Sequence, residues 1–414
     1  MSTIQETIQQ MGQQARAAAH RLAQLSSEEK NTILRAMASA IREAAPELIA
    51  ANELDLAAGK EKGLSSAMLD RLKLDEKRIE AMAVGIDEVA LLPDPVGQIL
   101  DEWDRPNGIR IQQVRVPIGT IGIIYESRPN VTADAAVLCF KTGNATILRG
   151  GSEAIHSNRA IAAALGRAGA PEYAIQLIPF TDRESVAALA QMDRWLDLII
   201  PRGGKGLIET VVSLARMPVI KHYDGICHLY VDPDADQEMA VNLTINSKTH
   251  KTGVCNALET LLVHREVAAE FLPKVVAALR EKKVEIRASE EALTIIPDAV
   301  PATEEDWFTE YLDLILSVKV VGSFEEAIQH INFYGSHHTD VIVTRNEAIA
   351  ERFLREVDSA CVFHNASTRF ADGGEFGFGA EIGISTDKLH ARGPMGLREL
   401  TSYQYRVRGN GQVR

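Results

Sequence analysis

Cys255 is the residue whose surroundings most strongly suggest chemistry. It follows a polar stretch, residues 246–254, that carries three potentially cationic side chains, Lys248, His250 and Lys251. Nearby positive charge lowers the pKa of a thiol and increases the fraction of thiolate, which is the nucleophilic form. Cys255 is therefore a candidate nucleophile, and a purely structural cysteine is the alternative.

The other cysteines have different surroundings. Cys139 and Cys361 stand in the apolar runs AAVLCF and SACVF and are predicted to be small core residues. Cys227 has His228 beside it, but adjacent residues of a strand point to opposite faces, so the two need not form a pair. The sequence has no C-x-x-C pair, which argues against a zinc ribbon or a disulfide framework and indicates a reducing, intracellular environment.

Two groups of residues have side chains that metal sites use. They are the pair His337 and His338, and the triplet His222, Cys227 and His228. Neither group has the H-x-x-x-H spacing of a helical metal site or a carboxylate at a familiar spacing. We therefore predict no metal site.

A glycine-rich turn offers a candidate anion site. The chain has no complete G-x-G-x-x-G or Walker A pattern. A strand that ends at Ile200 is instead followed, ahead of a helix, by Arg202, Gly203, Gly204 and Lys205. Backbone N–H groups at such a helix start bind anions, so this segment is either a phosphate site or an ordinary strand-to-helix turn. Arg149, at the end of the strand ATILRG, likewise holds either a phosphate or a neighbouring carboxylate.

The elements that position these residues follow from the apolar pattern. Residues 2–92 predict helix after helix, because apolar positions recur three and four apart. From 117 to 232, ending with HLYVD, apolar runs alternate with helical stretches; this predicts an open, mostly parallel sheet that binds a ligand at the carboxyl ends of its strands. A second alternation over 235–365 predicts a second α/β domain. The strand-like segments 109–119 and 402–414 are expected to pair in a β-arm that joins subunits.

Composition excludes several classes of protein. The 414 residues are 46% hydrophobic and 24% charged, which suits a chain of two or three globular domains. The 44 basic residues against 57 acidic ones give a net charge of −13 without a basic run, so nucleic acid is not an expected partner. The N-terminus is polar where a signal peptide is apolar, and no stretch approaches the roughly 20 apolar residues of a membrane span. We expect a cytoplasmic protein that does not bind membranes.

Five segments give the chain a strong resemblance, nearly end to end, to the gamma-glutamyl phosphate reductases, also called glutamate-5-semialdehyde dehydrogenases, of the aldehyde dehydrogenase superfamily. The segments are VPIGTIGIIYESRPN (116–130), GICHLYVD (225–232), TGVCNALETLLVH (252–264), the span 321–342 with AIQHINFYGSHHTDVI, and FGAEIGISTDKLHARGPMGL (378–397). The resemblance implies an α/β, aldehyde dehydrogenase-like fold with three parts. These are a Rossmann-like cofactor domain (1–100 and 117–228, with part of 366–398), a catalytic α/β domain (229–365) and a β oligomerisation arm (101–116 and 399–414).

The resemblance also implies a reaction and a site. The reaction is the NADPH-dependent reduction of L-glutamyl 5-phosphate to glutamate 5-semialdehyde with release of phosphate, in proline biosynthesis. By the family pattern Cys255 is the catalytic thiol and Asn130 the oxyanion-holding residue, although Arg128 competes for that place. Glu310 resembles the glutamate that holds the nicotinamide ribose, and Arg149 stands where the superfamily has a lysine near the adenosine ribose. The glycine-rich turn is a second candidate for the cofactor phosphates.

One departure from the superfamily pattern is informative. Oxidising aldehyde dehydrogenases have a glutamate that activates the water that hydrolyses the thioester, whereas His222 stands near that position here. Lack of that base suits an acyl-phosphate enzyme, because a hydrolytic water would waste its acyl intermediate. The alternatives are a non-phosphorylating aldehyde dehydrogenase that makes a carboxylate, a thiol hydrolase using Cys255 and His250, and a binding or scaffold protein without catalysis. A homo-oligomer is expected, and docking on the glutamate kinase that makes the substrate is left open.

Overall fold

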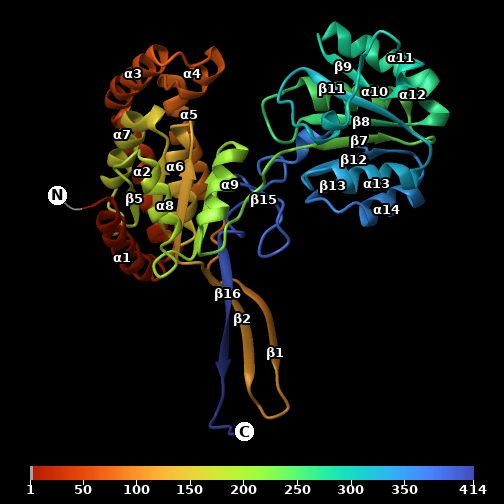
Figure 1. Ribbon diagram of the computed structural model, residues 1–414. Helices are drawn as coiled ribbons and strands as arrows, with labels where there is room; N and C mark the ends of the chain where they lie inside the picture. Colours follow the sequence, from red (N-terminus) through yellow and green to blue (C-terminus); the bar gives the residue numbers. More distant parts are fainter. Residues whose placement is uncertain (1–2) are drawn as a thin grey trace. The chain divides into compact units, whose positions relative to one another are not determined.

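The computed structural model describes residues 3–414. The chain forms two compact units, each with its own sheet. Unit 1 comprises residues up to 221 together with 378–383 and 395–414, and unit 2 comprises residues 222–377 and 384–394. Their ribbons are drawn in Figure 1.

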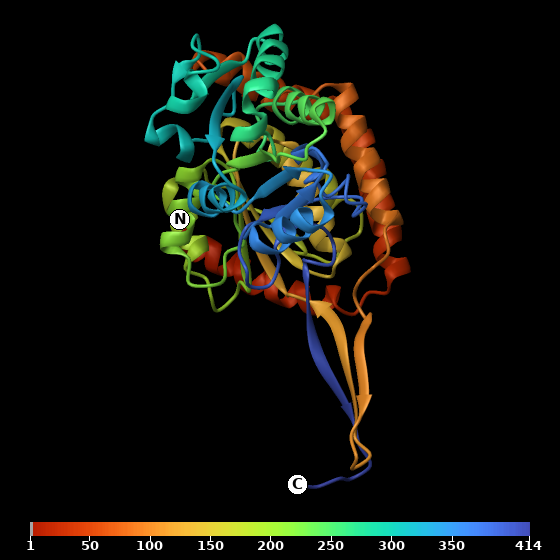
Figure 2. The same cartoon turned by 90° about the vertical axis from the view of Figure 1, so that its right-hand side faces the viewer.

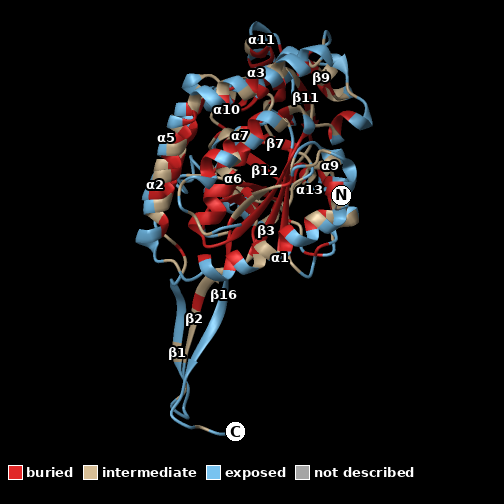
Figure 3. Ribbon diagram, turned by 90° about the vertical axis from the view of Figure 1, so that its left-hand side faces the viewer, coloured by how far each residue is buried: buried red, intermediate tan, exposed pale blue. Residues whose placement is uncertain are grey.

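The N-terminal part of unit 1 is helical, as the apolar spacing predicts. Its helices are α1 (Ile4–Leu22), α2 (Ser27–Glu43), α3 (Ala45–Glu61), α4 (Ser66–Leu72) and α5 (Glu76–Leu91). A capping box starts α2: the Ser26 hydroxyl accepts from the Glu29 N–H, and the Glu29 carboxylate accepts from the Ser26 N–H. Figure 3 shows the resulting two-sided helices, with buried residues on the face of α2 and α5 that covers the rest of the unit and exposed residues on the other.

A parallel sheet forms the centre of unit 1. Its strands are β3 (Thr120–Tyr125), β4 (Ala145–Gly150), β5 (Ile175–Leu177) and β6 (Leu198–Arg202), in the order β5-β4-β3-β6. The later helices of the unit are α6 (Asn130–Lys141), α7 (Ile155–Gly166), α8 (Arg183–Ala190) and α9 (Lys205–Leu214). The strand order reverses between β3 and β6, and in such a sheet ligands bind beyond the carboxyl ends of the strands at that reversal.

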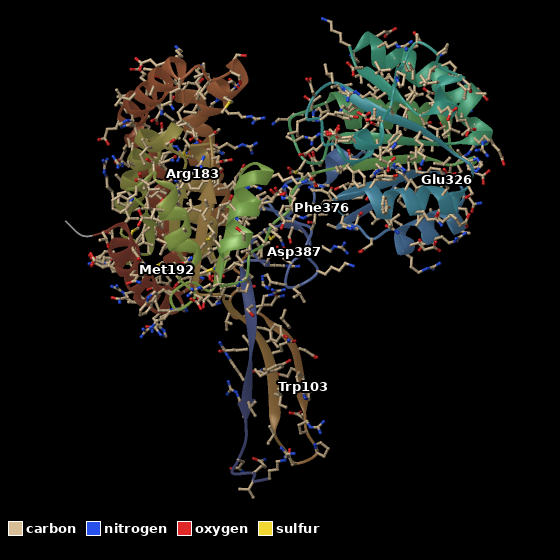
Figure 4. The ribbon with its side chains drawn as sticks, viewed as in Figure 1. Trp103, Arg183, Met192, Glu326, Phe376 and Asp387 are labelled. Atoms are coloured by element: carbon tan, nitrogen blue, oxygen red, sulfur yellow. The ribbon has the colours of Figure 1, made fainter. Side chains whose placement is uncertain are left out.

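The predicted β-arm is also present in unit 1. Strands β1 (Ile99–Asp104), β2 (Arg110–Pro117) and β16 (Thr401–Arg408) form an antiparallel sheet in the order β1-β2-β16. The strands extend away from the helices of the unit, as Figure 2 shows. Trp103, labelled in Figure 4, has its ring 6.2 Å from that of Tyr405. Seven of the eight residues of β16 are exposed, so the arm buries little surface of its own.

Unit 2 is built on a second parallel sheet. Its strands are β7 (Cys227–Val231), β8 (Leu258–His264), β9 (Glu285–Ala288), β10 (Val300–Pro301), β11 (Ile315–Val321), β12 (Thr339–Val343) and β13 (Cys361–His364), in the order β10-β9-β11-β8-β7-β12-β13. The helices are α10 (Gln237–Thr249), α11 (Arg265–Glu281), α12 (Glu290–Leu293), α13 (Phe324–Tyr334) and α14 (Glu347–Glu356). Strands β14 (Gly383–Ser385) and β15 (Gly393–Met395) form a separate two-stranded sheet.

The prediction from the sequence was wrong about the sheet to which one strand belongs. The segment HLYVD, predicted to close the first sheet, lies in β7, which pairs with β8 and β12 in unit 2. The chain accordingly enters unit 2 at His222, and a boundary between 228 and 229 would cut through β7. Strand pairing decides which sheet a strand joins, and an apolar run in the sequence does not show which strands it will pair with.

None of the helices in residues 3–414 is both long enough and apolar enough to cross a membrane.

Candidate active site

Cys255 lies in a tight turn between α10 and β8. The Val254 N–H donates to the Thr252 carbonyl at 2.9 Å, and the Ala257 N–H donates to the Val254 carbonyl at 3.1 Å. The buried Asn256 side chain donates from Nδ2 to the Ala371 carbonyl at 3.0 Å. The turn is therefore fixed on both sides of Cys255, whose own side chain is half-buried.

Gly225 packs directly against this turn. A Cβ atom at position 225 would lie 1.8 Å from the Cys255 carbonyl oxygen and 2.5 Å from its Cα atom. No side chain fits at those distances, so glycine is required by the close approach of two backbone segments. The Gly225 N–H donates to Glu310 Oε1 at 2.9 Å, which holds this segment in place.

Cys227 supports the same turn and is not a nucleophile of its own. Its thiol donates to the Cys255 carbonyl at 3.2 Å. Burial raises the pKa of Cys227 well above its usual value, with the charge of Asp340 acting in the same direction. The thiolate form is therefore strongly disfavoured, and Cys227 acts as a buried hydrogen-bond donor. Cys139 and Cys361 are buried as predicted, and burial raises the pKa of Cys139 to about 12.

Two histidines lie beside the Cys255 thiol. One ring nitrogen each of His222 and His338 and the Cys255 sulfur lie within 4.8 Å of one another. His222 Nδ1 is 3.0 Å from the Ile384 carbonyl oxygen, which can only accept, so Nδ1 carries a proton. His338 is fully buried, and desolvation, with a smaller contribution from His222, lowers its pKa to about 3. Its imidazole is neutral at physiological pH.

The cationic loop expected around Cys255 is only partly present. Lys248 points into the core, where its Nζ lies 2.6 Å from Glu259 Oε2 and both side chains are fully buried. Burial lowers the pKa of Lys248 and raises that of Glu259 to about 7. The Lys248 charge is thus offset by a carboxylate, because a buried ammonium needs a partner. His250 Nδ1 accepts from Arg369 Nε at 3.3 Å, and Lys251 is exposed.

The strand order explains why these residues meet. Each of the site residues stands just before a strand: Glu310 before β11, Cys255 before β8, Gly225 before β7 and His338 before β12. These four strands are consecutive neighbours in the parallel sheet. Parallel strands bring their amino ends to one edge. The candidate site of unit 2 therefore lies at the amino ends of its strands. The carboxyl-end prediction concerned the sheet expected over residues 117–232. His338 and Gly225 were not among the predicted site residues, and only the strand order reveals them.

The glycine-rich turn of unit 1 binds a carboxylate of the protein itself, that of Glu126. The Gly204 N–H, at the start of α9, donates to Glu126 Oε2 at 3.1 Å. A Cβ atom at Gly203 would lie 2.4 Å from that oxygen, so a larger residue there would displace the Glu126 carboxylate. Lys205 is exposed and Arg202 is half-buried. β3 and β6 flank the reversal of strand order, where such sheets bind ligands, and in this structure the Gly204 N–H there is engaged by the Glu126 carboxylate.

Arg149 lies near the carboxyl end of β4 in unit 1. Its side chain is only 8% exposed. Its Nε donates to Ser185 Oγ at 3.2 Å, and one terminal nitrogen donates to the Thr181 and Asp182 carbonyls at 2.6 and 3.3 Å. Arg149 therefore anchors the loop that precedes α8, and much of its donor capacity serves the protein.

Asn130, the predicted oxyanion-holding residue, starts α6 in unit 1, whereas Cys255 belongs to unit 2. Asn130 is exposed, and its Nδ2 donates to Asp134 Oδ2 at 2.8 Å. This bond opposes the burial that raises the pKa of Asp134 to about 6. An amide nitrogen has two N–H groups, so one such bond leaves the second proton for another acceptor. Arg128, the competing residue, is exposed as well.

The chain is similar to known proteins over nearly its whole length. The model of the aldehyde dehydrogenase family matches residues 2–300. A gamma-glutamyl phosphate reductase of Moorella thermoacetica is 59% identical over 411 residues, covering 98% of both chains, and one of Geobacter metallireducens is 56% identical over the full length of both. The crystal structure of gamma-glutamyl phosphate reductase from Thermotoga maritima has a TM-score of 0.96 at 48% identity and covers 98% of this chain and 99% of that one.

Proposed function

Because this chain belongs to the aldehyde dehydrogenase family and, within it, to the gamma-glutamyl phosphate reductases, we propose that it reduces L-glutamyl 5-phosphate to L-glutamate 5-semialdehyde with release of phosphate. This is a step of proline biosynthesis. The observation that carries the proposal at residue level is the Cys255 thiol, held on a fixed turn beside two histidines.

Cys255 is the proposed nucleophile. Its thiolate attacks the acyl carbon, a carbon–sulfur bond forms, and the bond to the phosphate oxygen breaks. Phosphate departs with the electron pair as an already stabilised anion. Asn130 is proposed to donate a hydrogen bond to the oxygen that becomes negative during attack. The resulting thioester keeps the acyl group on Cys255 until it is reduced.

His222 is proposed to take the thiol proton. The bond from its Nδ1 proton to the Ile384 carbonyl fixes the tautomer and leaves Nε2 as the basic nitrogen. His338 is a poorer candidate, because its pKa of about 3 makes it a weak base. Replacing His222 by Ala is expected to slow alkylation of Cys255 near neutral pH and to shift the pH dependence of alkylation. An unchanged pH profile would contradict this role.

A nicotinamide cofactor, when bound, supplies the hydride that reduces the thioester to the aldehyde. The cradle of Arg202, Gly203, Gly204 and Lys205 suits its phosphates, since the α9 helix start already binds the Glu126 carboxylate. Glu310 is proposed to hold the nicotinamide ribose while its other contact fixes Gly225. We propose NADPH as the cofactor rather than NADH.

Arg149 gives this cofactor preference a specific test. A residue that reads the 2′-phosphate would, on replacement by Ala, weaken NADPH binding by about tenfold to a hundredfold and NADH binding only slightly. A residue that only anchors the loop before α8 would, on the same replacement, weaken both cofactors alike and lower stability. Cofactor titrations of Arg149→Ala with both nucleotides, together with its thermal unfolding, separate the two roles.

The reaction itself is tested in the oxidising direction. With glutamate 5-semialdehyde and NADP as substrates, formation of NADPH should require inorganic phosphate, and Cys255→Ala should form none while remaining folded. Turnover without phosphate would instead favour a non-phosphorylating aldehyde dehydrogenase, in which water releases the acyl group. Substantial activity of Cys255→Ala would refute the assignment of the nucleophile.

Assembly and location complete the proposal. The sheet of β1, β2 and β16 exposes large apolar side chains at Leu100, Tyr403, Tyr405 and Val407, which suits an arm that joins subunits of a homo-oligomer. Removing the residues after Thr401 should weaken self-association in analytical ultracentrifugation, and a monomeric intact protein would contradict the proposal. None of the cysteines in residues 3–414 forms a disulfide, in keeping with the cytoplasmic location that we propose.

A further inference from the structure

We infer that Cys255, His222 and His338 form a Zn²⁺ site whose occupation blocks the Cys255 thiol. The binding site follows from the side chains alone, while its inhibitory effect rests on the proposed function of Cys255 as nucleophile. Zinc would act here as a reversible inhibitor and not as a cofactor of the reaction.

The three side chains have the composition and spacing of a zinc site. One sulfur and two ring nitrogens lie within 4.8 Å of one another. Zinc binds Cys sulfur at about 2.3 Å and His nitrogen at about 2.0–2.1 Å, so neighbouring ligands of a tetrahedral ion lie somewhat under 4 Å apart. Side-chain adjustments of less than about 1 Å would therefore bring all three atoms into contact with one ion, and a set of three protein ligands leaves a fourth position for water.

Nδ1 of each histidine already has a partner within the protein, as is usual for one nitrogen of a metal-binding imidazole. In His222, Nδ1–H donates to the Ile384 carbonyl at 3.0 Å, which orients the ring. In His338, Nδ1 lies 2.8 Å from Thr339 Oγ1, while Nε2 is buried without a hydrogen-bond partner among residues 3–414. An unpaired buried ring nitrogen costs free energy, and coordination of a metal would relieve that cost.

The charges are favourable for a divalent ion. A neutral imidazole is the form of histidine that binds zinc, and a thiolate is the form of cysteine that does so. Binding forms a zinc–sulfur bond and releases the thiol proton to solvent, without any change in oxidation state. Two neutral imidazoles and one thiolate leave a single positive charge on the complex, and the thiolate lone pair that would attack an acyl carbon is committed to the metal.

The site combines residues that the sequence placed in separate groups. His222 and His338 were each considered as metal ligands with their sequence neighbours, Cys227 and His228 for one and His337 for the other. In the fold, two of those neighbours are engaged elsewhere: His228 pairs with Asp340 at 2.8 Å, and His337 Nδ1 is bonded to the Asp358 carbonyl. The Cys227 sulfur lies 3.9 Å from His338 Nδ1, but its thiol donates to the Cys255 carbonyl. The fold joins His222 and His338 to Cys255 instead.

Direct binding is the first test. Zn²⁺ is titrated into the metal-free protein against a chromophoric chelator, and one tight equivalent is expected. Changes in the outer shell of a metal site cost about 10- to 100-fold in affinity, so loss of a ligand in Cys255→Ala, His222→Ala or His338→Ala should weaken binding at least that much. His250→Ala removes a histidine next to the turn but outside the cluster and should bind zinc like the wild type. Equal affinity in the wild type and in Cys255→Ala overturns the inference.

Cobalt supplies a structural readout that does not depend on activity. Co²⁺ in a site with a thiolate gives a sulfur-to-metal charge-transfer band, which should be present in the wild type and absent in Cys255→Ala. Because His338→Ala removes a fully buried ring and can lower stability, thermal unfolding is measured for each variant. Cys255→Ala changes only a half-buried side chain and therefore tests the site even if His338→Ala unfolds.

Turnover separates the inference from the proposed function. Zinc should inhibit formation of NADPH at the concentration at which it binds, and a chelator should restore the activity. Zinc that binds through Cys255 without slowing turnover would refute the catalytic role of Cys255 and leave the metal site standing. An enzyme that loses activity in Cys255→Ala but does not bind zinc would refute the metal site and leave the proposed function standing.

Discussion

Replacement of Gly225 by Ala tests how precisely the Cys255 turn must be placed. The added Cβ would lie 1.8, 2.4 and 2.5 Å from the carbonyl oxygen, carbonyl carbon and Cα of Cys255, where ordinary contacts are 3.4 to 4 Å. These neighbours are backbone atoms, which cannot rotate away. One of the two segments must therefore move by more than about 1 Å.

That displacement has two measurable consequences. Overpacking of this kind costs about 1–3 kcal/mol in the free energy of unfolding. A reactive group misplaced by about 1 Å loses roughly 100-fold in rate, which corresponds to about 2.7 kcal/mol in the activation free energy. We therefore expect Gly225→Ala to remain folded with a lower Tm and to lose about two orders of magnitude in kcat.

The assay measures kcat with glutamate 5-semialdehyde, phosphate and NADP, together with the rate of Cys255 alkylation by iodoacetamide and the thermal unfolding curve. Gly85→Ala is the matched control, because a Cβ there meets nothing within 4 Å and the residue lies inside α5. That variant should keep its activity and gain about 0.5–1 kcal/mol of stability. A kcat of Gly225→Ala within threefold of the wild type would refute the reasoning, because the turn would then tolerate displacement.

Two further predictions concern buried groups of unit 2. Lys248→Met leaves the fully buried Glu259 carboxylate without its partner and should lower the free energy of unfolding, measured by urea denaturation, by about 3–5 kcal/mol. The double variant Lys248→Met/Glu259→Gln should recover most of that loss. A single variant as stable as the wild type would contradict the role of the ion pair. His330 is buried against His228 and Lys319, and desolvation lowers its pKa from 6.5 to about 2. Because protonation then favours the unfolded chain, stability is complete above pH 6.5 and falls as the pH drops toward 2. The wild type should lose about 2 kcal/mol more than His330→Phe between pH 8 and pH 5, and parallel pH profiles would contradict this.

The elements of the fold were largely predictable because their signals are local. The helices up to residue 91 follow from apolar spacing, and the α2 N-terminus follows from Ser26 and Glu29. Each apolar run that predicted a strand contains one. The exception in assignment, β7, shows the limit: its five residues are all buried, as in a parallel strand of either unit, and only its pairing with β8 and β12 places it.

The site was predictable only where one residue carries the chemistry. Cys255 was found from its polar loop and from the resemblance to the family, but the predicted reason, a cluster of cations, is only partly correct, because Lys248 is paired with Glu259 in the core. Burial and pairing are tertiary properties that a loop sequence does not contain. Gly225 could have been suspected only as one glycine among 29, and its requirement comes from a backbone 30 residues away in the chain.

The placement of the site at strand amino ends explains its construction. In unit 1 the strand that ends at Tyr125 leads directly into Glu126, so the carboxyl ends of the sheet present backbone N–H groups and side chains suited to a phosphate-bearing ligand. In unit 2 the amino ends of β8 and β7 are pressed together, and the thiol of Cys227 holds the carbonyl of Cys255. A nucleophile must keep its position while its bonds change. Contacts to the backbone atoms of Cys255 fix that position without using the sulfur atom as a hydrogen-bond partner. The fixed backbone also keeps the sulfur beside the imidazoles of His222 and His338, so the arrangement that would hold a thiol ready for attack would also suit the binding of a metal ion.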